Sequence, residues 1–160
     1  MKKFAAMAFA ILFFLAVHPA SAQSDSVPVR GDSVIDLVYL GAMDCPPCRG
    51  WKNFDLPKLR ATKEFQHIRF TDVQKWITDP VPAEDALPLH LRTMRGEIVR
   101  VINRKNGSPM FALLVDGKGL RGGWGTSTYE KMLPVIEELV SRKLAAGKLT
   151  SASMHRGAAS

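Results

Sequence analysis

The stretch VIDLVYLGAMDCPPC, residues 34–48, contains the pattern that decides the fold. Residues 34–40 are almost all apolar and rich in β-branched and aromatic side chains, which predicts a strand buried on both faces. Residues 41–44 turn the chain, and a cysteine pair, Cys45 and Cys48, follows at once. We expect a helix to begin there, because the prolines at 46–47 fall in a first turn whose N–H groups have no intrahelical partner.

The pattern of the remaining chain predicts alternating strands and helices. Strands are expected at 68–73, 110–115 and 120–124, and helices at 83–104 and from Ser127 to about Ala146. The early strand–helix–strand unit, followed by two strands and a helix, predicts an α/β fold. Its form would be a three-layer sandwich, a central mixed sheet of about four strands with helices on both faces.

The first residues have the composition of a secretory signal peptide. Lys2 and Lys3 precede an apolar run, and the small residues up to Ala22 match a cleavage site. The run is shorter than the roughly 20 residues that span a bilayer, so an uncleaved anchor is the less favoured alternative. The sequence therefore predicts a periplasmic protein with no stable membrane insertion after cleavage.

The expected domain organisation follows from these boundaries. Residues 1–22 would form the signal peptide, 23–32 a flexible leader, 33–148 one folded domain and 149–160 a disordered tail. Cleavage would remove 22 of the 160 residues and leave 138, enough for one domain with its own core.

The chain carries a formal net charge of +7. Its basic residues are spread along the sequence and interleaved with acidic and aliphatic ones, which is typical of solvated helix faces. No basic run with interleaved aromatic residues indicates a nucleic-acid partner. The excess of positive charge weakly favours acidic partners.

Cys45 and Cys48 are the only cysteines in the chain. A bridge between them closes a very short loop and restrains little of the unfolded chain, so reversible dithiol/disulfide chemistry is the favoured reading over an inert structural bridge. A zinc site is disfavoured, because zinc takes four ligands and no second CxxC or suitably spaced histidines occur. We therefore expect no bound metal.

Two motifs make the chain resemble the thioredoxin superfamily over residues 34–146. The first is the CPPC motif directly after a buried strand, and the second is Ser108-Pro109 directly before the strand expected at 110–115. The resemblance implies a thioredoxin-like form of the α/β sandwich. It also implies that Pro109 is a cis-proline lying against the cysteine pair, and that Ser108 offers backbone hydrogen bonds to an extended substrate.

Two positions depart from the pattern of that family. Asp44 stands where thioredoxins commonly have tryptophan, and Tyr39 stands where thioredoxin has a buried acid. The run from Met43 to Cys48 looks more like periplasmic thioredoxin-like proteins related to disulfide isomerases and reductases.

The chemistry of such a site assigns the two cysteines different roles. Cys45 is expected to be the exposed nucleophile, with its pKa lowered by the helix N-terminus, and Cys48 the more buried resolving thiol. Pro46 and Pro47 remove backbone donors near the Cys45 sulfur, which favours a reductase or isomerase-like role over a strong oxidant. No dissociable cofactor is needed. The expected partners are exported cysteine-containing clients and a membrane or periplasmic redox partner.

Met43, Trp51 and Trp124 are candidates for an apolar surface around Cys45, and Trp51 is the favoured one because it lies one turn beyond Cys48. Core packing is the competing interpretation for each of them. The alternative function is a non-enzymatic module of the same fold, either copper-binding or an assembly partner.

Overall fold

A computed structural model describes residues 27–157, with side chains up to 149. The predicted signal peptide lies outside the described residues. Four strands form one sheet: β1 (Ile35–Ala42), β2 (Arg69–Lys75), β3 (Met110–Val115) and β4 (Lys118–Trp124). The helices are α1 (Pro46–Arg60), α2 (Leu89–Arg92), α3 (Arg95–Ile102) and α4 (Thr126–Gly157), with short 3₁₀ turns η1 (Lys63–His67) and η2 (Glu84–Ala86).

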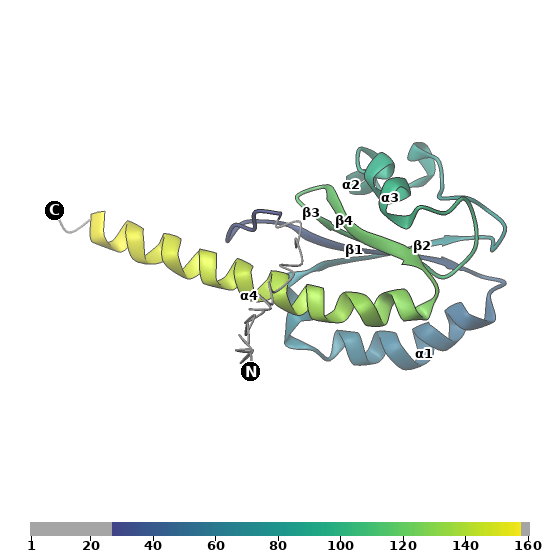
Figure 1. The fold of residues 1–160 in the computed structure, drawn as a ribbon, viewed down its shortest axis with the longest axis horizontal. Helices are drawn as coiled ribbons and strands as arrows, with labels where there is room; N and C mark the ends of the chain where they lie inside the picture. Colours follow the sequence, from purple (N-terminus) through teal and green to yellow (C-terminus); the bar gives the residue numbers. More distant parts are fainter. Residues whose placement is uncertain (1–26, 158–160) are drawn as a thin grey trace, which may run out of the picture.

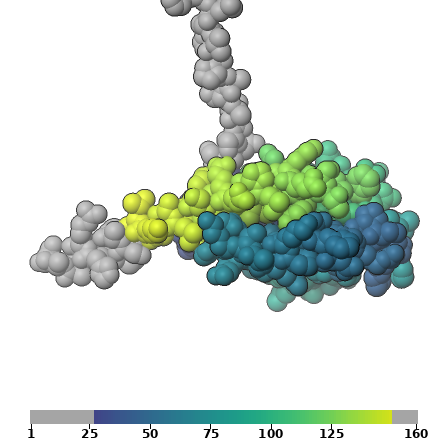
Figure 2. Space-filling view, turned by 90° about the horizontal axis from the view of Figure 1, so that it is seen from below, coloured from purple at the N-terminus to yellow at the C-terminus, as the bar shows by residue number. Residues whose placement is uncertain are grey.

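The strand order is β2-β1-β3-β4. β1 runs parallel to β2 and antiparallel to β3, and β3 pairs with β4 as a hairpin. Figure 1 shows α1 and α4 on one face of the sheet and α2 and α3 on the other. In the space-filling view, α1 and α4 lie side by side over their face (Figure 2). This is the predicted α/β three-layer sandwich, with a central mixed sheet of four strands.

β1 is the centre of the molecule, since every one of its residues is buried. Its side chains alternate between two cores, as the period of a strand requires. Leu37 and Tyr39 belong to the core beneath α1 and α4, and Val38 and Leu40 to the core beneath α2 and α3. Asp36 is also fully buried, and its carboxylate accepts two hydrogen bonds from Arg69 of β2.

The core beneath α1 is built around aromatic rings. Trp51 of α1 stacks on Tyr39, with ring centroids 4.5 Å apart, and meets Phe111 and Tyr129 edge-on at 5.1 and 5.2 Å. These contacts join α1, the sheet and α4. The indole Nε1 of Trp51 is buried and has no hydrogen-bond partner among the residues that the structure describes.

Both ends of the domain differ from the expectation. Val27 and Val29 pack against the core, and the Val27 carbonyl accepts a hydrogen bond of 2.9 Å from Arg142, so residues 27–32 are not a flexible leader. Helix α4 continues to Gly157, past residue 149, where the sequence predicts that a disordered tail begins.

A close backbone contact explains why α4 continues past Gly147. A Cβ on Gly31 would lie 2.6 Å from the Cα of Gly147. Gly147 therefore serves as a packing position inside the helix and not as its terminator. The residues immediately before it, RKLAA at 142–146, are all good helix formers.

The single helix expected at 83–104 is also divided. Residues 84–92 form η2 and α2, and α3 begins only at Arg95. Pro88 explains the break, because proline cannot donate to the preceding turn. Asn103, in the left-handed conformation with φ of 50°, ends α3.

The aromatic core yields a prediction about Trp51. Trp51→Ala is expected to lower the free energy of unfolding by about 3–5 kcal/mol, as large aromatic truncations in a core do. Trp51→Phe should cost much less, because it keeps most of the ring and removes an N–H group whose burial without a partner itself costs about 1–3 kcal/mol. Urea denaturation followed by circular dichroism measures both.

Trp76→Ala is the matched control, because Trp76 is an exposed tryptophan. Its effect should stay within about 0.5 kcal/mol. Equal losses for the two Trp51 variants would contradict the proposed cost of the buried indole N–H.

Candidate functional site

The cysteine pair forms a disulfide at the N-terminus of α1. Cys45 is the N-cap residue, and the Cys48 N–H donates to the Cys45 Sγ over 3.2 Å. Pro46 and Pro47 occupy the first two helical positions and have no N–H to offer. The Cys48 amide is therefore the first helical N–H that can stabilise negative charge on the Cys45 sulfur.

Both cysteines are buried, and this corrects the expectation that Cys45 is exposed. Cys45 is 0% and Cys48 2% exposed, and both belong to the core cluster beneath α1. The exposed residues here are their neighbours at 43–44 and 46–47. The physical reason is the tight turn, in which the Cys45 N–H donates to the Ala42 carbonyl over 3.4 Å and the bridge faces the protein interior. An incoming thiolate reaches this disulfide only after the turn moves.

Ser108 and Pro109 lie at the same edge of the sheet as the disulfide. Leu40 of β1 pairs with Met110 of β3, so the end of β1 that leads to Cys45 meets the start of β3. The Ser108–Pro109 peptide bond, for which the resemblance implies the cis form, is cis. Both residues are buried, and the Ser108 hydroxyl lies 3.5 Å from the Leu40 carbonyl oxygen.

Sequence reasoning missed Lys75, the last residue of β2, which connects the loops around the site. Its buried Nζ donates to the carbonyls of Trp76, Asp79 and Gly107, at 3.0, 2.7 and 2.7 Å. Its own carbonyl accepts from the Met43 N–H over 3.3 Å. Burial lowers the pKa of Lys75, partly offset by the carboxylates of Asp79 and Asp44.

A signal for Lys75 was present in the sequence. The alternation of β2 continues beyond Val73, and a step of two residues places Lys75 on the same buried face. A lysine at an inward position of a strand needs internal acceptors for its ammonium group. Here backbone carbonyls of the adjoining loops supply them.

Tyr39 and Asp44, the two departures from the family pattern, have structural partners. The Tyr39 hydroxyl donates to the Cys48 carbonyl over 3.4 Å, and burial raises the pKa of this phenol above its ordinary value. The Asp44 carboxylate accepts from the Ile77 N–H over 2.9 Å and holds the turn against the loop after β2. Tyr39 is therefore a hydrogen-bond donor at this site and not a replacement for the family's acid.

Trp51 is not a surface residue, which corrects its selection as a substrate contact. It is 1% exposed, because it lies on the face of α1 that packs on the sheet. Met43 and Trp124, the other two candidates, are 57% and 47% exposed. Trp76 is a further exposed aromatic residue, and it lines a hollow of about 420 Å³ together with Met43 and the 79–83 loop.

No helix within residues 27–157 has the length and apolar character required to cross a membrane. Within the same range, His, Cys, Asp and Glu side chains do not gather in groups of three or more that could hold a metal ion.

Solved structures with a related arrangement include two thioredoxin-like proteins. One is the periplasmic thioredoxin SoxS from Paracoccus pantotrophus in its reduced form, with 17% identity and a TM-score of 0.42, covering 68% of this chain and 97% of that chain. The other is Trxlp from Edwardsiella tarda EIB202, with 20% identity and a TM-score of 0.41, covering 66% of this chain and 82% of that chain. Neither protein-family models nor curated proteins gave a match.

The environment of the tyrosines predicts the response to alkaline pH. Tyr39 and Tyr129 are the only tyrosines in the chain, and burial raises the pKa of both, that of Tyr129 to about 12. The unfolded chain ionises near the ordinary value of 10.0. These groups therefore contribute stability that is complete below pH 10 and is lost as the pH rises through the folded-state pKa.

At pH 10, the tyrosinate absorbance of the folded protein should accordingly be almost the same as at pH 7. In the urea-unfolded protein, about half of the tyrosine side chains should be ionised at that pH. Circular dichroism at the same pH verifies that the chain is folded. A folded protein in which one tyrosine titrates at 10 would refute the burial of that ring.

Lys75 yields a second prediction at this site. Lys75→Met keeps the length of the side chain but leaves three carbonyls without their donor, so the free energy of unfolding should fall by about 1–3 kcal/mol. Lys118→Met, at an exposed position of β4, is the control and should have almost no effect. Denaturant titration of both variants makes the comparison, and equal stabilities would contradict the role assigned to Lys75.

Proposed function

We propose that this protein is a periplasmic thiol-disulfide oxidoreductase that exchanges disulfides with exported, cysteine-containing clients. The observation that carries the proposal is the Cys45–Cys48 disulfide at the N-terminus of α1, at the sheet edge where the Ser108–Pro109 loop begins β3. A two-cysteine bridge at a helix N-terminus can accept and release two electrons without a bound cofactor.

The reaction proceeds in two exchanges. The Cys45 thiolate attacks one sulfur of a client disulfide, forms a mixed disulfide and releases the first client sulfur as a thiolate. The Cys48 thiolate then attacks Cys45, forms the intramolecular bridge and releases the second client sulfur. The client gains two electrons, and a membrane or periplasmic redox partner returns two electrons to the cysteine pair.

The local backbone favours a reductase or isomerase-like direction. The positive end of the α1 dipole and the Cys48 N–H stabilise the Cys45 thiolate. The two prolines withhold further donors, and no histidine lies between the cysteines. A moderately stabilised thiolate corresponds to a less oxidising couple than a strongly stabilised one.

Burial of both sulfurs adds a conformational step to the cycle. The dithiol is regenerated only when a thiolate of the redox partner attacks Cys45 of the bridge, and this requires the turn at residues 43–47 to open. The contacts that hold the turn are few: Met43 to the Lys75 carbonyl, Asp44 to Ile77, and Cys45 to Ala42. We propose that an extended segment of the substrate binds along the loop of Ser108 and Pro109, which lies next to this turn.

The proposal predicts different outcomes for the two cysteine variants. The reduced wild-type protein should accelerate the reduction of a protein disulfide such as that of insulin, and Cys45→Ala should reduce the rate to the uncatalysed level. Cys48→Ala, expressed in the exporting cell, should accumulate clients bound to Cys45 as mixed disulfides that separate under reducing electrophoresis.

Cys45→Ala expressed in the same way is the control for the trapping experiment, since it retains one cysteine but lacks the nucleophile. Equal trapping by the two variants would contradict the assignment of Cys45 as the nucleophile and Cys48 as the resolving thiol. Stoichiometric binding of copper(I) that needs both cysteines, without turnover of any disulfide, would support a metal carrier instead.

A further inference from the structure

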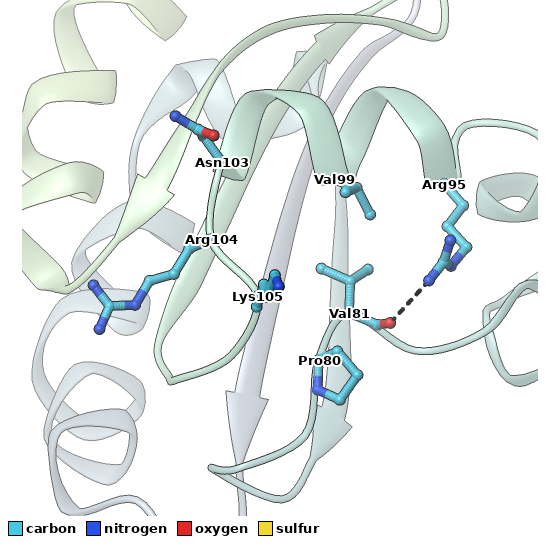
Figure 3. Close-up of a pocket in the computed structure, with 7 residues that line it drawn as sticks. All are labelled: Pro80, Val81, Arg95, Val99, Asn103, Arg104 and Lys105. Atoms are coloured by element: carbon cyan, nitrogen blue, oxygen red, sulfur yellow. Dashed lines mark hydrogen bonds between the residues drawn. The ribbon is translucent and has the colours of Figure 1, made fainter.

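A basic hollow of about 530 Å³ lies beside α3, on the face of the sheet opposite α1. Figure 3 shows its lining, which combines apolar side chains from the 80–81 segment and α3 with the polar end of α3: Pro80, Val81, Arg95, Val99, Asn103, Arg104 and Lys105. Its volume is in the range of sites that bind small molecules or a few side chains of a peptide.

The charges of the basic hollow are all of one sign. Arg95, Arg104 and Lys105 line it without a carboxylate, and none of the ion pairs among the described side chains involves these three residues. Glu97, the acid on α3, is engaged elsewhere: it pairs with Arg100 and accepts from the Gly119 N–H over 2.8 Å. The hollow therefore favours a negatively charged occupant.

Two of the three cations are held in place by other contacts. Arg95 donates to the carbonyls of Pro82 and Val81, at 2.7 and 3.4 Å. The Arg104 guanidinium lies 4.5 Å from the ring centroid of Trp124 and donates to the Asn106 carbonyl. Each arginine retains N–H groups beyond these bonds, because a guanidinium carries five donors. Lys105 is exposed.

The apolar part of the lining distinguishes between kinds of anion. Pro80, Val81 and Val99 offer aliphatic surface between the cations, which a phosphate ion would leave unused. An acidic peptide segment uses both components, with carboxylates on the cations and carbon chains on the aliphatic surface. The proposed cleavage removes Lys2 and Lys3 and lowers the formal charge from +7 to +5, and this positive excess attracts the same class of partner from a distance.

The basic hollow adjoins a second hollow that reaches the turn before Cys45. Its residues Pro80 and Val81 also line the neighbouring hollow that contains Met43, two residues before Cys45. On its other side, Lys105 leads into the loop of Gly107, which donates to the Ile77 carbonyl and accepts from Lys75. A Cβ on Gly107 would lie 2.8 Å from the Trp124 indole nitrogen, so this loop packs against the same ring as Arg104.

We propose that the basic hollow binds an acidic segment of the client polypeptide near the cysteine that exchanges with Cys45. This inference rests on the proposed function and gives it a substrate class: client disulfides flanked by aspartate or glutamate. The hollow increases the affinity for such clients, while the disulfide exchange at Cys45 and Cys48 is the same for all clients.

The test compares three disulfide peptides that differ only in the residues flanking the cysteine: aspartate and glutamate, asparagine and glutamine, or lysine. The wild-type protein should reduce the acidic peptide with the highest kcat/KM, through a lower KM. Lys105→Glu should reduce this preference about two- to fivefold, as expected for one exposed charge pair, and leave the kcat for the neutral peptide unchanged.

Lys148→Glu is the matched control, because it makes the same change in net charge at an exposed position on α4, whereas Lys105 lines the hollow beside α3. It should keep the wild-type preference. An equal effect of the two variants, or no preference in the wild type, would overturn the inference.

A binding experiment separates this inference from the proposed function. A fluorescent acidic peptide with serine in place of cysteine should bind the wild type and Lys148→Glu, and bind Lys105→Glu more weakly, by fluorescence anisotropy. Equal affinities for all three proteins would overturn the inference even if every disulfide peptide is reduced. Displacement by inorganic phosphate at concentrations where sodium chloride of equal ionic strength has no effect would also overturn it, because it would indicate a simple anion site. Peptide binding without reduction of any disulfide would contradict the proposed function alone.

Discussion

The burial of β1 on both faces positions the other elements of the domain. The strand pairs with β2 on one side and β3 on the other, and its side chains enter both cores. A strand in this position has no edge exposed to water, so its register and direction are strongly determined. The chain leaves it at Ala42, and the cysteine pair follows within a few residues at the start of α1. The location of the disulfide at this sheet edge is therefore a consequence of how β1 is packed.

Loops from three distant parts of the chain meet at this edge, and a buried ammonium group joins them. Lys75 contacts the turn before Cys45 through its carbonyl and the loops at 76–79 and 107 through its Nζ. Burying a charge is costly unless its hydrogen bonds are made internally, so these loops supply what the lysine requires. These hydrogen bonds also restrict the positions of the loops relative to one another. The turn before Cys45 is one of the segments restricted in this way.

The place where positive side chains gather also depends on the tertiary structure. Along the sequence, Arg95, Arg104 and Lys105 resemble other basic residues interleaved with acids, which is why they predict only a solvated helix face. The turn at Asn103 and the packing of the 80–82 segment bring these residues to one hollow. Glu97, which is close to them in sequence, is occupied by Arg100 and the β4 backbone. The uncompensated positive charge beside the redox site is thus a property of the fold.

The α/β class, the buried first strand, the helix beginning at the CPPC motif and the strands at 110–115 and 120–124 could all be predicted from the sequence, since each depends on local periodicity and turn chemistry. The sequence also identified the cysteine pair and the Ser108–Pro109 loop through their motifs. Four features became visible only in the tertiary structure. They are the burial of Cys45, the placement of Trp51 in the core, the hydrogen bonds from Lys75 to the loop carbonyls and the extension of α4 to Gly157. The physical reason is that burial, ammonium–carbonyl contacts and the approach of Gly31 to Gly147 involve residues far apart in the chain, and a local pattern carries no information about which distant groups will meet.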